Sequence, residues 1–207
     1  MKLLSTILFI ALCTTATAQK KILTADTTIP IPLLQFDAKG ELIITASATS
    51  SPNDFNFLVG KWKMHNRRLN KRLENCKDWT EFESGSENQK ILNGTGDMDT
   101  YSTTQMPGME GKPFEGLTLR LFNPKTKLWS LYWIPSNTGI LGTPIVGSFE
   151  NNIGHFFAKE TYNGKNVIIV FRWDKRDKDR PLWGQAFSPD NGKTWEWNFY
   201  NVSERIK

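Results

Sequence analysis

The feature that most constrains the fold is a series of short stretches in which apolar and polar residues alternate between turn-forming residues. A period of two places every second side chain on the same face of a β-strand. Connections this short join antiparallel neighbours, because a parallel pair needs a crossover of a dozen residues or more. The expected strands cover residues 60–69, 78–86, 90–101, 115–122, 128–134, 145–150, 155–162, 166–174, 182–187 and 194–203.

The turns between these stretches favour hairpins. Asn163-Gly164 fits a two-residue type I′ turn, in which both central residues need a positive φ. Helical periodicity is confined to residues 54–58 and 67–75. An open sheet of so many strands would expose its edges, and closure removes them. We therefore predict an all-β protein: an antiparallel up-and-down β-barrel of about eight to ten strands, with a short helical turn before the first strand.

The chain begins with the pattern of an export signal. Lys2 precedes an apolar run over residues 3–12, and Ala-Thr-Ala at 16–18 is a small-residue cleavage pattern. We expect cleavage near Ala18 and a periplasmic or secreted mature protein. A lipoprotein anchored through Cys13 is the less favoured alternative, because the residue before a lipidated cysteine is normally small and here it is leucine.

Three regions follow from this pattern: a signal peptide at 1–18, an extended leader at 19–52 and the barrel domain at 53–207. A peripheral strand is expected at 41–46 within the leader, which we expect to pack loosely on the barrel. No apolar segment is long enough for a transmembrane helix. After cleavage only Cys76 remains, so no intramolecular disulfide is expected.

Charge excludes one class of partner. The formal net charge is +5, but basic residues are scattered or paired with acids, as in residues 174–180, where the signs alternate. A nucleic-acid-binding protein concentrates positive charge on one face. We therefore expect no nucleic-acid partner.

Residues 56–62, Asn-Phe-Leu-Val-Gly-Lys-Trp, resemble the start of the first strand in lipocalin-like (calycin) barrels. The resemblance implies that a helical turn closes one barrel end and that Gly60 and Trp62 start the first strand. It also implies that Trp62 packs beside a basic residue of the last strand, Arg205 or, failing that, Lys207.

A broader resemblance covers residues 54–204. The segments at 62–69, 116–124, 129–133 and 171–173 are similar to those of a bacterial family of secreted proteins with a lipocalin-like domain and no assigned function. It supports the fold and implies no catalytic residues. Residues 188–195 match the Asp-box of sialidases, but one copy indicates a stable hairpin turn rather than glycosidase activity.

Alternation also predicts which polar side chains point inward. Arg120 and Arg172 each lie in mid-strand between apolar neighbours, and Arg68 shares the face of Trp62. A buried guanidinium needs a partner, because leaving it unpaired costs several kcal/mol. The hypothesis is a polar cluster in a ring-lined barrel, which would recognise a carboxylate or another polar group. Its expected members are Arg68, Arg120, Arg172, Glu81 or Glu83, Tyr132, Gln185 and Asn198. The alternatives are an internal structural ion pair or outward arginines lying over Trp rings.

The sequence contains no convincing pattern for a metal or cofactor site. His65 and His155 are the only histidines, and no pair has the spacing of metal ligands, so we expect neither a metal nor a cofactor. His65 should face outward. Asp97 and Asp99 are assigned to a surface turn, with weak calcium binding as the alternative.

The sequence favours a non-enzymatic binder of a small, partly apolar molecule, because thirteen Phe and eight Trp can line a cavity. Two alternatives stay open. One is a barrel enzyme of the isomerase or lyase type that uses Tyr132, a Glu and an Arg. The other is a carbohydrate-binding module with exposed Trp.

Overall fold

The computed structural model describes residues 28–207. The predicted signal peptide at 1–18, with Lys2, Cys13 and Ala18, lies outside the described residues. Two short strands, β1 (Gln35–Phe36) and β2 (Leu42–Ile43), precede the 3-10 turn η1 (Asn56–Leu58). The barrel strands are β3 (Gly60–Leu69), β4 (Trp79–Ile91), β5 (Gly96–Thr103), β6 (Phe114–Asn123), β7 (Leu128–Pro135), β8 (Ile145–Glu150), β9 (Ile153–Tyr162), β10 (Lys165–Asp174), β11 (Leu182–Ser188) and β12 (Glu196–Arg205). A second 3-10 turn, η2 (Leu92–Gly94), joins β4 to β5.

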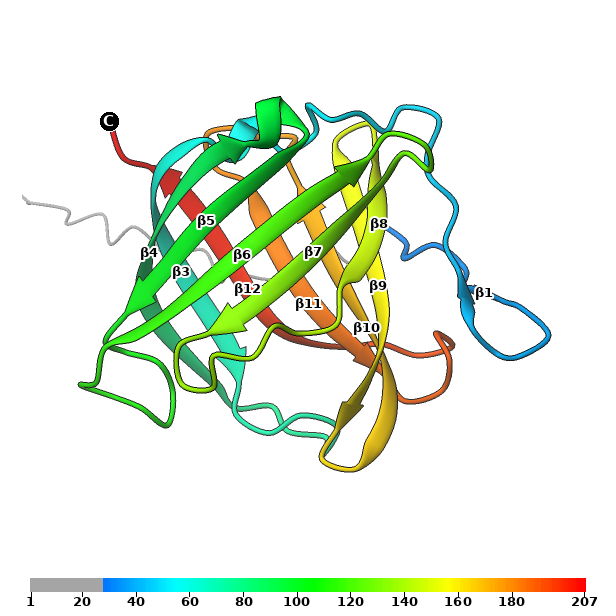
Figure 1. Cartoon of the computed structure of the whole chain (residues 1–207). Coiled ribbons are helices and arrows are strands. Elements are labelled where there is room, and N and C mark those ends of the chain that lie inside the picture. The colour runs from blue at the N-terminus through cyan, green and yellow to red at the C-terminus, as the bar shows by residue number, and fades with distance from the viewer. Residues whose placement is uncertain (1–27) are drawn as a thin grey trace, which may run out of the picture.

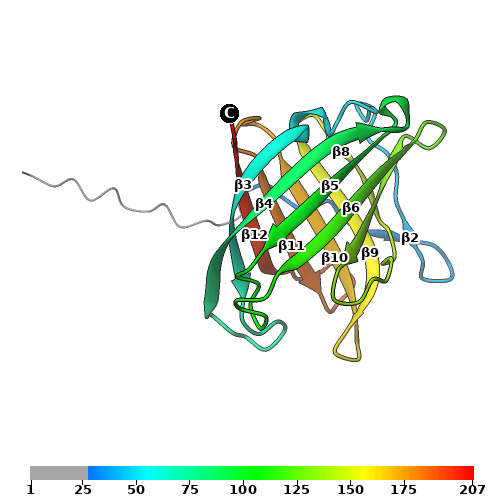
Figure 2. The ribbon, with the colours of Figure 1, turned by 60° about the vertical axis from the view of Figure 1, so that its left-hand side comes forward.

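The ten strands from β3 to β12 form a closed antiparallel barrel in which each strand pairs with its neighbour in sequence. Closure occurs between β12 and β3, where Arg205 lies opposite Trp62. The tilted strands wrap around one axis in both views (Figures 1 and 2). The predicted fold class is confirmed, including the helical turn directly before β3.

One end of the barrel is closed by η1 and an aromatic cluster. The Phe55 side chain is fully buried and contacts the rings of Trp129, Phe149, Phe156 and Trp173 at centroid distances of 4.9 to 6.2 Å. The contacts with Trp129, Phe149 and Trp173 are edge to face, a geometry that adds to the stabilisation from burial. We call this the closed end.

The resemblance to lipocalin-like barrels implied a contact at the closed end, and the structure has it. The Arg205 guanidinium lies 4.1 Å from the ring centre of Trp62 and donates hydrogen bonds to the carbonyl oxygens of Val59 and Phe57. Trp62 Nε1 donates to the Leu58 carbonyl at 2.6 Å. Gly60 has a φ of 118°, and a Cβ there would lie 3.2 Å from the Arg205 guanidinium. Glycine is favoured at this position both by its backbone conformation and by the close approach of Arg205.

The leader, from residue 28 to 52, packs on the outside of the barrel instead of lying loosely. Its apolar side chains Ile31, Leu34, Phe36, Leu42 and Ile44 cover the outer faces of β9 to β12. There Ile168, Val170 and Ala186 are buried although they point away from the barrel interior. In Figure 1 this blue segment runs outside the wall.

Candidate functional site

The barrel encloses a cavity of about 660 Å³. It extends from Leu58 and Trp62 at the closed end to the loop between β7 and β8 at the opposite end, which we call the mouth. Ile140 in that loop lines the cavity and is also exposed, so the cavity reaches the surface there. Aromatic and aliphatic side chains dominate the wall, as is usual for sites that bind small molecules. The rings include Trp62, Tyr101, Phe114, Trp133, Phe171, Trp173, Trp183 and Phe199.

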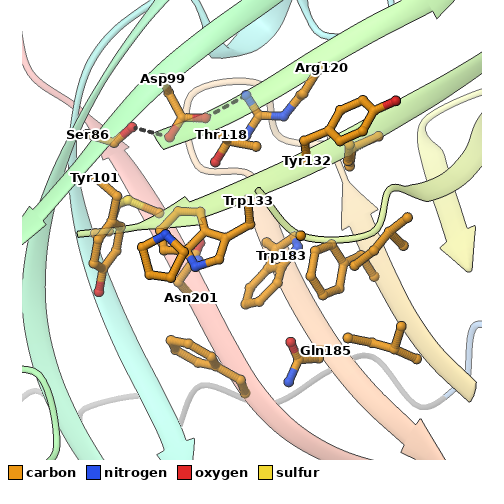
Figure 3. Close-up of a pocket in the computed structure, with 18 of the residues that line it drawn as sticks. Ser86, Asp99, Tyr101, Thr118, Arg120, Tyr132, Trp133, Trp183, Gln185 and Asn201 are labelled. Carbon is orange, nitrogen blue, oxygen red and sulfur yellow. Dashed lines mark hydrogen bonds and ion pairs between the residues drawn. The ribbon is translucent and has the colours of Figure 1, made fainter. Parts of the chain in front are cut away.

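Arg120 lies in the wall near the closed end, as the alternation along its strand predicted. Its side chain is buried, and its guanidinium carbon lies 5.1 Å from the ring centre of Phe55. Its Nη1 donates to Asp97 Oδ1 at 2.8 Å. The same nitrogen lies 2.6 Å from Asp99 Oδ1, and Figure 3 shows this ion pair. The register of β5 and β6 places Asp97 directly opposite Arg120.

The assignment of Asp97 and Asp99 to a surface turn was wrong. β4 continues to Ile91 and reverses at η2, so both carboxylates lie on β5 and point inward, with exposed fractions of 0% and 7%. Their two-residue spacing is itself the signature of one strand face. The neighbouring Gly and Thr suggested a loop and obscured that signal.

Burial and charge act against each other in this cluster. Burial raises the pKa of Asp97 above its usual value, although Arg120 acts in the opposite direction. Burial lowers the pKa of Arg120, but Asp99 and Asp97 together outweigh it, so the guanidinium stays charged. Two carboxylates thus share one cation inside the barrel.

Arg68 lies on the inner face of β3 and lines the cavity. Its Nη1 is 3.7 Å from Met106 Sδ, and within the described chain no carboxylate stands at ion-pair distance from it. Arg72 lies beside the cavity, with its guanidinium over the rings of Tyr162 and Phe187. Burial, and then the charge of Arg68, lower the pKa of Arg72 to about 10. Arg72 was missed because it lies beyond Leu69, the last residue of β3, where alternation gives no guide.

Arg172 does not belong to the cavity, and its predicted place in the cluster was wrong. It lies on the outer face of β10, where its guanidinium is 4.4 Å from the ring centre of Trp197. It is buried because the leader covers it, and Nη1 donates to the Ile29 carbonyl at 3.0 Å. This matches the alternative of an outward arginine over a Trp ring, with a peptide segment on top.

The expected acidic partners in β4 also point outward. Phe82 and Ser84 occupy the inner face, so Glu83 lies outside and forms a hydrogen bond with His65 Nδ1 at 2.7 Å. Glu81 lies 3.4 Å from the other nitrogen of the same imidazole. His65 faces outward, as predicted. Among residues 28–207 no cluster of three metal-binding side chains is present.

Of the remaining predicted members of the polar cluster, Gln185 and Tyr132 border the cavity and Asn198 does not. Gln185 lines the cavity and donates to Asn198 Oδ1 at 2.8 Å. Asn198 is fully buried at a β-bulge in β12, which places Phe199 opposite Gln185. Tyr132 borders the cavity, but its hydroxyl points away from the other labelled side chains (Figure 3).

Comparisons with known proteins agree with the fold. No protein-family model matches the chain, and no curated protein matches its sequence. Among solved structures, the S-type phycobiliprotein lyase CPES from Guillardia theta is similar, with a TM-score of 0.50 and 11% sequence identity over 77% of this chain and 94% of that chain. No helix among the described residues has the length and apolar character to cross a bilayer. With its closed antiparallel barrel and helical closing turn, the chain is a protein of lipocalin-like fold.

Proposed function

We propose that the barrel binds one small, partly apolar molecule that carries an acidic group. The cavity of about 660 Å³ has the size of sites that hold small ligands, and its rings suit an apolar body. The likeness to a phycobiliprotein lyase supports a barrel that receives a small molecule.

The observation that carries the acidic group is Arg68. Its guanidinium lies in the wall without a carboxylate partner in the described chain, and Arg72 adds a second positive charge beside it. Arg120 does not fill this role, because Asp97 and Asp99 already neutralise it. A carboxylate at Arg68 would form the charge-assisted, bidentate pair that arginine favours.

The test is binding of dodecanoate to the mature protein, measured by displacement of anilinonaphthalene sulfonate and by calorimetry. Arg68→Gln should weaken dodecanoate binding by about tenfold or more, since a hydrogen bond to a charged group contributes roughly 1.5–3 kcal/mol. Dodecanol, which has no charge, should bind both proteins equally.

The matched control is Arg67→Gln. Arg67 precedes Arg68 on β3 but faces outward over Trp79, with 4.7 Å between guanidinium carbon and ring centre. It should leave dodecanoate binding unchanged. A folded Arg68→Gln protein that binds dodecanoate as tightly as the wild type would refute the role of Arg68, and a wild type that binds no probe would refute the binding function.

Neither alternative gains an observation that favours it over binding; the similar solved structure is a lyase, which is compatible with both a binder and an enzyme. The Trp side chains at 62, 79, 129, 133, 173, 183, 195 and 197 are all at least partly buried, which leaves no exposed Trp platform for a sugar. The Tyr132 hydroxyl, which an isomerase or lyase would use, points away from the labelled cavity residues.

We also propose that the protein is exported and cleaved near Ala18, on the strength of the apolar run at 3–12 and the small residues at 16–18. Expression of the full chain in a Gram-negative host should yield a mature protein that begins at Gln19. A mature protein that begins with a lipidated Cys13 would replace this proposal with a lipid anchor.

A further inference from the structure

The deep end of the cavity carries more negative than positive charge. Asp99, Asn88, Ser86 and Arg120 line it, and Asp97 lies behind them; we call these five residues the floor cluster. Within the described chain, Arg120 is the cation that pairs with both aspartates. With both aspartates ionised, the floor cluster therefore holds one uncompensated carboxylate in a largely apolar interior.

The other nearby cations of the described chain are engaged elsewhere. Lys90 Nζ donates to the Pro52 carbonyl at 3.1 Å, and Lys175 Nζ lies 3.5 Å from Asp54. An unbalanced buried charge costs several kcal/mol unless a proton or another cation compensates it. Burial raises the pKa of Asp97, so a proton can supply that compensation when the cavity is empty.

Asn88 provides an independent observation. Its side chain is 4% exposed and lines the cavity, and its Nδ2 donates to Asp97 Oδ1 at 3.3 Å. That bond sets the orientation of the amide, because only its nitrogen can donate to the carboxylate. The buried Asn88 Oδ1 then has no hydrogen-bond partner in the described chain, and neither does Asp97 Oδ2.

The floor cluster therefore contains hydrogen-bond acceptors that lack a donor within the described chain. Ser86 Oγ already donates to Asp99 Oδ2 at 3.3 Å. Arg120 Nε is a donor without a partner, but its guanidinium lies over the rings of Phe55 and Trp173. Buried polar atoms are normally satisfied by a partner. The missing partner of Asn88 Oδ1 must be a donor.

We propose that the floor cluster receives a protonated nitrogen of the ligand, bound by Asp99 and Asn88. This rests on the proposed binding function and narrows its ligand class: an elongated molecule with an acidic group at Arg68, an apolar body and a nitrogen donor at the closed end. The role of Asp97 is to supply the second negative charge behind Asp99.

The experiment compares the affinity for dodecanoate with that for ω-aminododecanoate, and the affinity for hexadecanoate with that for ω-aminohexadecanoate. Two chain lengths are used so that a chain too short to reach the floor cluster does not determine the outcome. At neutral pH at least one ω-amino acid should bind the mature protein at least tenfold tighter than its parent acid. Asp99→Asn should abolish that gain while dodecanoate binding persists. Asp99→Asn should fold, because it leaves one carboxylate opposite one guanidinium. Asp97→Asn removes the other carboxylate of the floor cluster and therefore tests the same excess negative charge at a residue that does not line the cavity.

The control is Glu87→Gln, which removes a negative charge from the position next to Asn88 on β4, on the outer face. It should leave the amine preference intact. If the parent acids bind but neither amine gains affinity, or if the gain survives in both Asp99→Asn and Asp97→Asn, the floor cluster does not bind nitrogen and the barrel remains a binder of acids. If no acid binds, the binding function itself fails.

Discussion

At the scale of single residues, the pairing of Arg120 with Asp97 and Asp99 is the most consequential contact of the interior. All three side chains are buried, and the two carboxylates depend on one guanidinium for compensation. Removing one partner of a buried ion pair lowers the stability by far more than the net contribution of the intact pair, because an unpaired charge is left in the interior.

Arg120→Leu should therefore lower the free energy of unfolding by about 3 kcal/mol or more at neutral pH. Urea denaturation of the mature protein measures this. Adding Asp97→Asn and Asp99→Asn to Arg120→Leu should recover much of the loss, since no charge is then left unpaired. A single Arg120→Leu variant as stable as the wild type would contradict a buried ion pair.

At the scale of elements, the leader acts as an outer layer of the barrel. Leu34 packs in the apolar cluster formed by the leader and β9 to β12. Its side chain also lies against Gly192 in the β11–β12 turn, where a Cβ would stand if that residue had one. Leu33, one residue earlier, is 94% exposed. The leader covers the outer face of β10, which explains why residues 167–171 of that strand form a continuous hydrophobic run.

Leu34→Ser should lower the free energy of unfolding by about 1–2 kcal/mol, because Leu34 is partly buried and a fully buried leucine side chain contributes about 1.5–3 kcal/mol, while Leu33→Ser changes it little. Thermal unfolding compares the two variants. Limited proteolysis should also cut the leader faster in Leu34→Ser. Equal melting temperatures for both variants would mean that the leader is not part of the folded unit.

At the scale of the whole molecule, the folding equilibrium should depend on acid through His155. This imidazole lies beside Arg172 on the outer wall; burial, and then the charge of Arg172, lower its pKa from 6.5 to about 4. Between these two values the unfolded chain binds a proton that the folded chain does not. The stability contribution is therefore present above pH 6.5 and is lost as the pH falls toward 4, by up to about 3 kcal/mol.

His155→Gln should flatten this part of the curve of unfolding free energy against pH. Denaturation at a series of pH values, with wild type and variant side by side, measures the difference in slope. Equal slopes between pH 6.5 and pH 4 would contradict a neutral, buried His155.

Much of this architecture follows from local sequence. Alternation places Trp62, Met64 and Arg68 on one face and Arg120 on the inner face of its strand, because a strand has only two faces. The turn chemistry also holds: Asn163 and Gly164 have φ values of 49° and 75°, as a type I′ turn requires.

Other features depend on contacts between distant segments. The register between β5 and β6, which local patterns do not encode, places Asp97 directly opposite Arg120. The bulge at Asn198 interrupts the alternation of β12 and puts Trp197 and Phe199 on different faces. Arg172 is buried only because the leader folds back over it. The sequence by itself determined the strands and most of their inner faces, since these depend on neighbours along the chain. Only the tertiary structure decided which charges meet and which outer face is covered, because both depend on residues that closure and docking bring together.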